Sequence, residues 1–552
     1  MEPAALLERA RNRGVNPVMY RIARLALIPF FRVYFRLGRS GRAHVPREGP
    51  VIFAANHRSF LDPFVIAACA RRPLYFVAKK ELFQKSRLQS WLLNSLGAFP
   101  IDRGRGDAES MATARRILER GDGVLIFPEG TRVRPGPLGH PRRGVGRLAL
   151  ETGAAVVPVA VIGTESIRTG WRVRPRRVTV RCGAPLRFPK VERPSPALAK
   201  AVTDRVWPCV ELQWEWLGGA APLRRIAIVG AGSWGTGLAV ALARAGIEVD
   251  LGCRTAEQAE HVAATRENDR YLPGVPLPEG VRVARAEQLD LAAADLVCLA
   301  VPTSALPVAM AESADRLGPG TALLVSSKGL VPPAGETATA WCAARAGGRP
   351  VACLGGPAHA ADALEHGASL VVASSDRELA ARLRRVFADA GFDVETTRDV
   401  IGVDLAGVAK NAAVLAATTA SVLGPNASGA AAGKVFSEVA RYATSQGALP
   451  ETWVGLAGAG DLVASVVAAG GRNRRAGELL ARGVPAHEVR PTIGQVVEAL
   501  ETLPLLAEAL ERDGRRAPAT RALAQVVAGK RSARGFAEHV TEPRRIVGSR
   551  VA

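Results

Sequence analysis

The sequence predicts two α/β units in series, the second of which ends in an all-helical region. In the N-terminal part, short apolar runs alternate with helical patterns, which is typical of an α/β layer. A second series of such runs begins at Arg225, where a strand leads into glycines and a helix, as in a doubly wound sheet. After about residue 399 the strand-like runs stop and helical patterns take over. A length of 552 residues fits such a multidomain chain.

Each expected strand is a short run dominated by Val, Ile, Leu and Ala. In the first unit we expect strands at residues 51–55, 74–78, 123–127, 155–161 and 178–182. In the second unit we expect them at 226–229, 248–253, 296–301, 322–326, 351–354 and 370–373. The chain then divides into a basic and aromatic N-terminal segment, an α/β domain, a linker rich in Pro and Trp, a second α/β domain and a helical domain, with expected bounds of 1–40, 41–205, 206–222, 223–398 and 399–552.

Positive charge is concentrated in the first unit. The formal net charge of the whole chain is +22. Residues 1–220 hold 38 Lys and Arg against 17 Asp and Glu, whereas the remainder holds 35 against 34. This asymmetry indicates an anionic partner such as a membrane, a phosphorylated substrate, an acidic carrier protein or nucleic acid. Because no nucleic-acid-binding motif accompanies the charge, we expect no nucleic-acid partner.

The N-terminal segment and the cysteines bear on localisation. Seven scattered cysteines without a CxxC pair indicate free thiols in a reducing cytoplasm and no metal site, and the first residues lack the apolar core of a signal peptide.

Residues 18–37 mix aromatic side chains with arginines, but the longest uncharged run, 25–31, is too short to span a bilayer. The segment is either interfacial, at the inner face of an anionic membrane, or an amphipathic helix packed on its own domain. Pro29 is expected to break or kink it.

A histidine and an aspartate five residues apart follow the first expected strand. On a regular helix His57 and Asp62 would point about 140° apart, so they can face each other only if the histidine lies on the loop and the aspartate in the following turn. An aspartate that accepts one ring N–H leaves the other nitrogen as a base able to deprotonate a hydroxyl. Arg103 and Arg132 each lie near another strand and offer forked donors suited to a phosphate.

Four blocks carry a family resemblance over about residues 40–185: 56–63, 97–103, 127–132 and Val157-Pro158. In this order and spacing they resemble the glycerophospholipid acyltransferases, specifically the 1-acylglycerol-3-phosphate acyltransferases. The resemblance implies that His57 is the base, that Asp62 orients it, and that the acceptor's phosphate is held by Arg103, Glu129, Gly130, Thr131 and Arg132.

The same resemblance implies the substrates. Acyl-CoA or acyl carrier protein would be the donor and lysophosphatidic acid the acceptor. The hydroxyl would attack the thioester directly, because the motif holds no nucleophilic Ser or Cys in place of the base. In one departure from the family pattern, Arg143-Gly144 stands where a lysine often precedes the glycine.

A glycine motif opens the second unit. It consists of Gly230, Gly232, Ser233, Trp234 and Gly235, between a strand and a helix, as in a Rossmann dinucleotide-binding domain. The glycines allow a tight turn and close approach of a pyrophosphate to the helix N-terminus. At the end of the second strand Cys253 occupies the position of the usual ribose-binding acid, and Arg254 follows. We therefore expect NADP(H) to be accepted at least as well as NAD(H).

Further polar residues stand at positions typical of active sites, either at the end of an expected strand or within an apolar helical run. Lys328 follows a strand at the edge where such sheets bind ligands. Lys410 stands in an apolar run, where desolvation would lower its pKa and improve it as a proton donor, although a snorkelling surface lysine is the alternative. Asp461 follows a Gly-rich turn from which it could contact Lys410, and Arg472 and Asn473 could hold a phosphate.

From about residue 225 to 530, these blocks resemble the bacterial glycerol-3-phosphate dehydrogenases, as do Val301-Pro302, Gly356-Pro357 and Asn426-Ala427. The resemblance implies that Lys410 is the general acid and base at the ketone oxygen of dihydroxyacetone phosphate, flanked by Lys328 and Asp461. It implies substrate binding by Lys328, Gly356, Asn411, Ser465, Arg472 and Asn473. It implies that NAD(P)H binds at the glycine motif, Arg254, Lys328 and Glu498, without a metal, and that a homodimer could form.

Three departures from this second pattern are visible: Lys434-Val435 for Arg-Gly, Ala361 for an acidic residue, and Ser465 for threonine. None of them removes a matched catalytic group. The sequence thus indicates a bifunctional enzyme that forms glycerol 3-phosphate and acylates a glycerol phosphate. The two steps are consecutive only if the acyltransferase accepts glycerol 3-phosphate itself. The alternative for the first unit is a membrane-docking module with little chemistry of its own.

Overall fold

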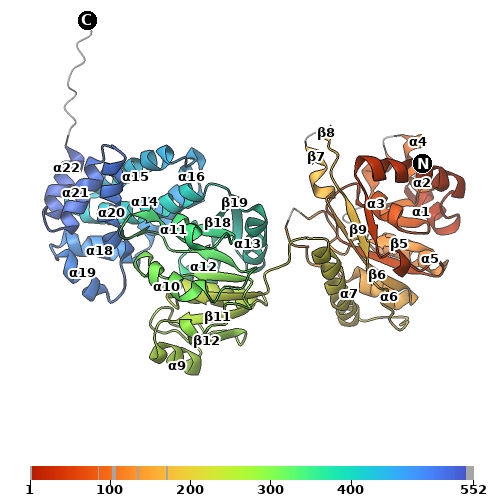
Figure 1. Cartoon of the computed structure of the whole chain (residues 1–552), viewed down its shortest axis with the longest axis horizontal. Coiled ribbons are helices and arrows are strands. Elements are labelled where there is room, and N and C mark those ends of the chain that lie inside the picture. The colour runs from red at the N-terminus through yellow and green to blue at the C-terminus, as the bar shows by residue number, and fades with distance from the viewer. Residues whose placement is uncertain (1–2, 85, 102–106, 134–135, 170–171, 543–552) are drawn as a thin grey trace, which may run out of the picture. The chain divides into compact units, whose positions relative to one another are not determined.

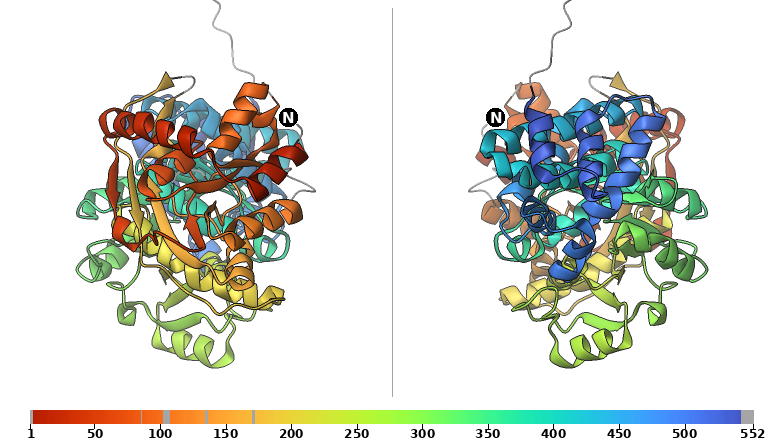
Figure 2. Two further views of the ribbon diagram at one scale, coloured as in Figure 1. Left: turned by 90° about the vertical axis from the view of Figure 1, so that its right-hand side faces the viewer. Right: turned by 90° about the vertical axis from the view of Figure 1, so that its left-hand side faces the viewer.

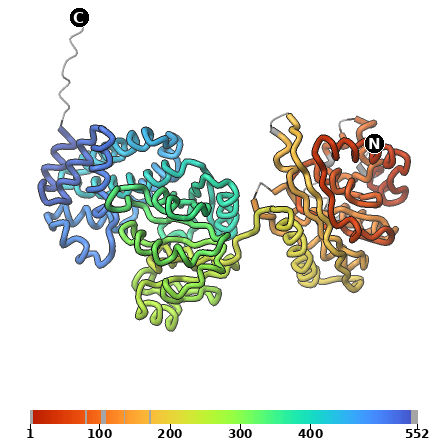
Figure 3. The backbone as a smooth tube through the Cα atoms, in the orientation of Figure 1, coloured from red at the N-terminus to blue at the C-terminus, as the bar shows by residue number. Residues whose placement is uncertain are grey.

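The structure, a computed structural model, describes residues 3–84, 86–101, 107–133, 136–169 and 172–542. The chain forms two compact units, Met1–Pro222 and Leu223–Ala552, each with its own main sheet (Figure 1). The backbone can be followed from one unit into the other in Figure 3. The fold class predicted from the sequence, two α/β layers followed by helices, is confirmed.

The first unit is built on a seven-stranded sheet in the order β1-β9-β6-β2-β5-β3-β4. The central strand β2 is buried along its whole length and pairs in parallel with β5 and β6. The five expected strands are present, and β1 and β4 extend the sheet at its edges. The strands are β1 (Gly38–Ser40), β2 (Val51–Ala55), β3 (Leu74–Lys79), β4 (Ala98–Ile101), β5 (Gly123–Ile126), β6 (Ala155–Ile162) and β9 (Thr179–Cys182), with a separate hairpin of β7 (Arg168–Thr169) and β8 (Arg172–Val173).

Apolar clusters cover both faces of this sheet, because successive side chains of a strand point to opposite faces. Phe53 of β2 belongs to one cluster with α3 (Asp62–Cys69), and Ile52 belongs to the other with α6 (Gly144–Thr152). The remaining helices of the unit are α1 (Pro3–Asn12), α2 (Pro17–Tyr34), α4 (Arg87–Ser95), α5 (Asp107–Glu119) and α7 (Pro196–Trp216).

The predicted linker 206–222 is wrong for most of its length. Helix α7 continues to Trp216 and so crosses the predicted boundary at residue 205. Trp207, Val210 and Trp214 are buried in the first unit's core, at the spacing that places them on one helix face. Trp207 and Trp214 are therefore packing residues of the first unit and not part of a linker, whereas Trp216 at the end of the helix is exposed.

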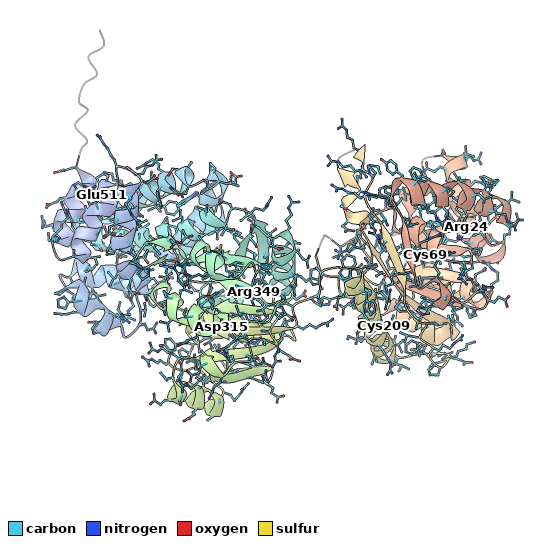
Figure 4. The ribbon with its side chains drawn as sticks, viewed as in Figure 1. Arg24, Cys69, Cys209, Asp315, Arg349 and Glu511 are labelled. Atoms are coloured by element: carbon cyan, nitrogen blue, oxygen red, sulfur yellow. The ribbon has the colours of Figure 1, made fainter. Side chains whose placement is uncertain are left out.

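The N-terminal segment packs on the first unit and also leaves an apolar face exposed. Helix α2 runs through Pro29 without ending there, so of the predicted break or kink at this proline the break does not occur. Phe31 and Phe35 are buried against β2 and α3, whereas Leu25 and Val33 are 72% and 81% exposed. The Arg24 guanidinium, labelled with Cys69 in Figure 4, donates to the carbonyl oxygens of Ala67 and Ala70 at 2.8 and 2.9 Å. This contact joins α2 to the C-terminal end of α3.

The second unit is built on an eight-stranded sheet in the order β12-β11-β10-β13-β14-β17-β18-β19. All neighbouring strands are parallel except β17 and β18. The six expected strands are present, and β12 and β19 form the two edges. The strands are β10 (Arg225–Val229), β11 (Glu248–Cys253), β12 (Val281–Arg285), β13 (Leu296–Leu299), β14 (Ala322–Val325), β17 (Val351–Gly355), β18 (Ser369–Ser374) and β19 (Asp393–Thr397), with a small pair of β15 (Leu330–Val331) and β16 (Glu336–Thr337).

Helices alternate with the strands of this sheet, and after the last strand the chain forms a region of helices only. The helices that alternate with the strands are α8 (Ser233–Arg244), α9 (Ala256–Thr265), α10 (Leu306–Ala314), α11 (Ala338–Arg345), α12 (Ala360–His366) and α13 (Arg377–Asp389). The helical region, blue in the right-hand view of Figure 2, contains α14 (Val400–Thr419), α15 (Pro425–Ser445), α16 (Pro450–Val454), the π-helix η7 (Leu456–Gly460), α17 (Asp461–Val467), α18 (Arg472–Ala481), α19 (Ala486–Ile493), α20 (Glu498–Arg512), α21 (Pro518–Val527) and α22 (Ala533–Thr541).

Helix α14 is the centre of the helical region. The stretch Val400–Leu423 is long and apolar enough to cross a membrane, but its most apolar window is 89% buried within the protein, as expected for a core helix. A bent pair of helices, Pro450–Val467 with Arg472–Ala481, passes the same test of composition. The Lys434-Val435 departure is accommodated here, because Lys434 Nζ donates to the carbonyl of Val540 and Val435 is fully buried.

Candidate active sites

His57 and Asp62 meet as the sequence predicts. His57 lies on the loop after β2, Asp62 opens α3, and Nδ1 of His57 is 2.9 Å from Oδ2 of Asp62. The aspartate is fully buried, and its other neighbours are the backbone N–H groups of Arg58 and Ser59 and the hydroxyl of Thr164, at 2.6, 2.7 and 2.6 Å. All of these groups donate to the carboxylate and hold it in one orientation.

In this arrangement Nε2 of His57 is the ring nitrogen that can act on a substrate. With Nδ1–H donating to Asp62, the other ring nitrogen carries a lone pair. The ring stacks on Phe127 at 4.0 Å between centroids, and the side chain is 14% exposed, so it is held in place but can reach a substrate. Thr164 was not anticipated from the sequence, because it lies in a short 3-10 helix just after β6, 102 residues from the aspartate that it contacts.

Glu129 is hydrogen-bonded to the backbone of the site, so the structure shows a supporting role for it, and its contact with the acceptor's phosphate stays a prediction. Its Oε2 accepts from the backbone N–H of His57 at 2.7 Å, and its Oε1 accepts from that of Gly139 at 2.6 Å. Burial raises the pKa of Glu129, and these two hydrogen bonds oppose the rise. A buried carboxyl group with both oxygens engaged ties the loops of the site together.

The remaining phosphate candidates lie at the turn after β5. Thr131 and Arg132 are exposed there, next to Gly130, whose φ of +70° favours glycine. A Cβ at Gly130 would lie 2.9 Å from Nε of Arg142, so that guanidinium lies over the turn. Arg142 was not among the residues predicted from the sequence, where only its neighbour Arg143 was noted, at the place of a lysine that often precedes the glycine. Arg103 lies outside the described residues.

In the second unit, two lysines share one buried aspartate. Lys328 Nζ lies 2.6 Å from Oδ2 of Asp461, and Lys410 Nζ lies 3.3 Å from Oδ1. Lys410 also donates to Ser465 Oγ at 3.1 Å, and Lys328 donates to the carbonyl of Gly356 at 3.3 Å. Lys328 follows β14 and Lys410 lies in α14, so the cluster joins the sheet to the helical region.

The charges in this lysine cluster shift one another's pKa. Burial lowers the pKa of Lys410, and the attraction of Asp461 only partly offsets this. Burial by itself would raise the pKa of Asp461, but Lys328 and Lys410 outweigh it and hold that pKa below its usual range. Burial raises the pKa of Glu498, which lies near enough to Lys410 to interact with it. The sequence-based prediction that Lys410 is desolvated is confirmed.

Two asparagines connect the cluster to the expected phosphate site. Asn411 Nδ2 donates to the carbonyl of Lys328 at 2.9 Å, and its Oδ1 accepts from Asn473 Nδ2 at 2.8 Å. Arg472 begins α18, is exposed, and donates to the carbonyl of Val496 at 3.2 Å. The structure thus brings together residues that the sequence places more than 60 positions apart.

The glycine motif fits the pyrophosphate of a dinucleotide. At Gly230 φ is +114° and a Cβ would lie 2.6 Å from the carbonyl oxygen of Ala300, while at Gly235 it would lie 2.0 Å from that of Gly230. At Gly232 a Cβ would meet nothing within 4 Å among the described residues, and no side chain caps α8 at this end. The N–H groups of the first turn, which include Ser233 and Trp234, are therefore available to an anion.

The residues at the end of β11 are compatible with the expected binding of NADP(H). Cys253, in place of the usual acid, is buried, and Arg254 is exposed directly after it. Arg285 is the register partner of Cys253 on β12. Because position 253 carries a cysteine and not a carboxylate, no negative charge there would repel the 2′-phosphate of NADP(H).

One residue near the lysine cluster was not singled out from the sequence. His359 directly precedes α12 and interacts electrostatically with Lys410, Asp461 and Lys328. The only signal for it is its position two residues after the Gly356-Pro357 block.

Known proteins share both units. Residues 36–162 match the family described as Acyltransferase, and residues 225–381 and 399–538 match the N- and C-terminal parts of NAD-dependent glycerol-3-phosphate dehydrogenase. The chain is 40% identical over 307 residues to the glycerol-3-phosphate dehydrogenase (NAD(P)+) of Deinococcus radiodurans, covering 55% of this chain and 90% of that protein. It is 36% identical over 315 residues to that of Geobacillus kaustophilus, covering 56% and 92%.

A solved structure agrees with these sequence matches. The crystal structure of glycerol-3-phosphate dehydrogenase from Coxiella burnetii superposes with a TM-score of 0.56 at 28% identity, covering 58% of this chain and 99% of that one. The chain therefore belongs to the NAD(P)-dependent glycerol-3-phosphate dehydrogenase family and carries an acyltransferase-family domain ahead of it.

Proposed function

We propose that this chain is a bifunctional phospholipid-precursor enzyme. Its second unit interconverts dihydroxyacetone phosphate and sn-glycerol 3-phosphate with NAD(P)H. Its first unit transfers an acyl group from acyl-CoA or acyl carrier protein to 1-acyl-sn-glycerol 3-phosphate. The observation that carries the proposal is the presence in one chain of an oriented His57–Asp62 pair and a buried Lys410–Asp461–Lys328 cluster.

For the dehydrogenase, the lysine cluster supplies the proton. When bound, NAD(P)H provides the hydride for the carbonyl carbon of dihydroxyacetone phosphate. Lys410 Nζ donates its proton to the oxygen that gains negative charge, and its lowered pKa makes that transfer easier. Asp461 keeps the lysine ammonium in place, and the Asn411–Asn473 pair leads toward the phosphate side of the substrate.

For the acyltransferase, the pair acts as a general base. Nε2 of His57 takes the proton of the acceptor hydroxyl as its oxygen forms a bond to the thioester carbonyl carbon. The carbon–sulfur bond then breaks, and the thiolate leaves as a thiol with the proton from His57. Asp62 stabilises the imidazolium between the two transfers. The exposed Arg132 and Arg142 at the turn after β5 would hold the acceptor's phosphate.

We further propose that the first unit works at the inner face of an anionic membrane. Helix α2 exposes Val18, Ile22, Leu25 and Val33 along its length. The neighbouring β7–β8 hairpin is held to α2 by a 2.8 Å hydrogen bond from Tyr34 to the carbonyl of Val173. The hairpin and the segment after it expose further arginines: Arg172, Arg174, Arg176 and Arg177. Apolar side chains beside arginines suit an interface with anionic lipid.

Product analysis by mass spectrometry tests both activities. The purified chain is incubated with dihydroxyacetone phosphate, NADPH and acyl-CoA, with or without lysophosphatidic acid. If glycerol 3-phosphate accumulates and only added lysophosphatidic acid becomes phosphatidic acid, the proposed acceptor is correct. If lysophosphatidic acid forms from dihydroxyacetone phosphate alone, the first unit acylates glycerol 3-phosphate itself and the two steps are consecutive. If no acyl ester forms while the chain still binds anionic vesicles, the first unit is a docking module.

A further inference from the structure

A histidine at the dehydrogenase site has a ring nitrogen without a partner. Nε2 of His359 is shielded from solvent and has no hydrogen-bond partner in the described part of the chain. Although His359 stands directly before α12, its side chain does not cap that helix. A buried polar atom that stays unpaired is an exception in folded proteins and calls for an explanation, of which a missing ligand is one.

The backbone on one side of His359 is held against the lysine cluster. Lys328 donates to the carbonyl of Gly356 at 3.3 Å, three residues before the histidine. A Cβ at Gly460, the residue before Asp461, would lie 3.9 Å from Cδ of Pro357. The strand-to-helix loop that carries His359 is therefore packed on the loop that carries the shared aspartate.

The backbone on the other side is held against the helix of the glycine motif. Ala360 follows His359, and its Cβ lies 3.0 Å from where a Cβ at Gly237 of α8 would lie. Ala358 packs on the same apolar cluster as Trp234 of that motif. His359 thus lies at the junction of the expected cofactor site and the lysine cluster, where a substrate must sit to receive both a hydride and a proton.

The ring itself interacts with the charges of the cluster. Burial lowers the pKa of His359, and Lys410 and Lys328 lower it further, against the opposing effect of Asp461 and of Asp362 on its own helix. The ring is consequently neutral near pH 7 and can form a hydrogen bond without adding charge to a site that already holds two lysines.

We propose that Nε2 of His359 forms a hydrogen bond with the terminal hydroxyl of dihydroxyacetone phosphate or glycerol 3-phosphate. The inference rests on the dehydrogenase function and adds a specificity-determining residue to it. The three-carbon substrate has three oxygen groups to hold. Lys410 serves the oxygen at C2, and Arg472 and Asn473 serve the phosphate, which leaves the terminal hydroxyl for the unpaired nitrogen beside Lys410.

The test compares two ketones that differ only in that hydroxyl, dihydroxyacetone phosphate and hydroxyacetone phosphate. NADPH oxidation by the full chain is followed with each ketone as substrate. His359→Phe keeps the bulk of the ring and removes the hydrogen bond. We expect this variant to lose about tenfold in kcat/KM for dihydroxyacetone phosphate and less than about twofold for hydroxyacetone phosphate. His359→Gln, which can still donate, should recover part of the loss.

His366→Phe is the matched control, because His366 is exposed at the far end of the same helix. This substitution should leave kcat/KM unchanged for both ketones. An equal loss on both ketones would show that His359 only packs, and unchanged kinetics on both would show that it does not contact the hydroxyl. Either result overturns the inference. A wild-type chain that oxidises no NADPH with dihydroxyacetone phosphate would overturn the dehydrogenase function itself, which the variant comparison would not do.

Discussion

The Nδ1 atom of His57 lies 2.9 Å from Oδ2 of Asp62, although the histidine is on a loop and the aspartate is the first residue of a helix. The aspartate is fully buried and is held by three further donors. It therefore fixes the imidazole in one tautomer, and Nε2 is the atom left to act on a substrate.

Replacing this base separates the two activities. We expect His57→Ala to lower acyl transfer by a factor of about 100 to 10,000, the usual contribution of a positioned general base. Reduction of dihydroxyacetone phosphate, measured on the same preparation, should be unchanged, because the lysine cluster lies in the other unit. Acyl transfer that survives the substitution would show that His57 is not the base.

The guanidinium of Arg142 is expected to bind the acceptor's phosphate. Arg142→Ala should raise KM for lysophosphatidic acid by about tenfold or more with little change in kcat, because a charge-assisted hydrogen bond is lost in the bound state. The matched control is Arg147→Ala on α6, since Arg147 is engaged with Glu151 at 2.7 Å. Equal effects of the two substitutions on KM would indicate a general loss of positive charge instead of a specific contact.

The pH dependence of the dehydrogenase should follow Lys410. Reduction needs the protonated lysine, so its rate falls as the pH rises through the pKa of Lys410, which burial places below the ordinary value of 10.5. Asp461→Asn removes a charge that raises this pKa, and we expect the alkaline limb of the pH–rate profile to move to lower pH. Oxidation of glycerol 3-phosphate needs the neutral lysine and should show the opposite slope. A limb that stays in place in Asp461→Asn would contradict the assignment of Lys410.

Cofactor preference should depend on Arg254. Arg254→Ala is expected to raise KM for NADPH by about tenfold and to leave KM for NADH nearly unchanged, because only NADPH carries the 2′-phosphate. Arg244→Ala at the exposed end of α8 is the control. A parallel change in both cofactors would place Arg254 outside the 2′-phosphate site.

Much of the fold and of the site could be predicted, because the signals are local. The buried strand 51–55 is a continuous apolar run, and its bounds agree with β2. The contact of His57 with Asp62 could be inferred because the two residues are five positions apart, with the histidine on a loop and the aspartate in the turn that follows it. Lys410 is the only charged residue between Asp404 and Lys434 in a long apolar stretch, so its desolvation could be inferred before its partners were known.

Other features could not be predicted, because the residues that decide them are far apart in the chain. Glu129 carries a charge and stands in a motif, but the N–H groups that donate to it belong to His57 and Gly139, and only these contacts show that it supports the loops of the site. The C-terminal part of α7, residues 206–216, is rich in Trp and contains Pro208, and only its packing in the core shows that it belongs to the first unit.

The sequence by itself determined the two α/β units, the helical region and the residue types able to transfer a proton, because periodicity and spacing are properties of short segments. The tertiary structure alone decided which of those residues meet. It placed Lys328 and Lys410 on one aspartate, Arg142 over Gly130, and the unpaired nitrogen of His359 beside the lysines. The physical reason is that burial and hydrogen bonding depend on what surrounds a side chain in space, and most of that comes from distant parts of the chain.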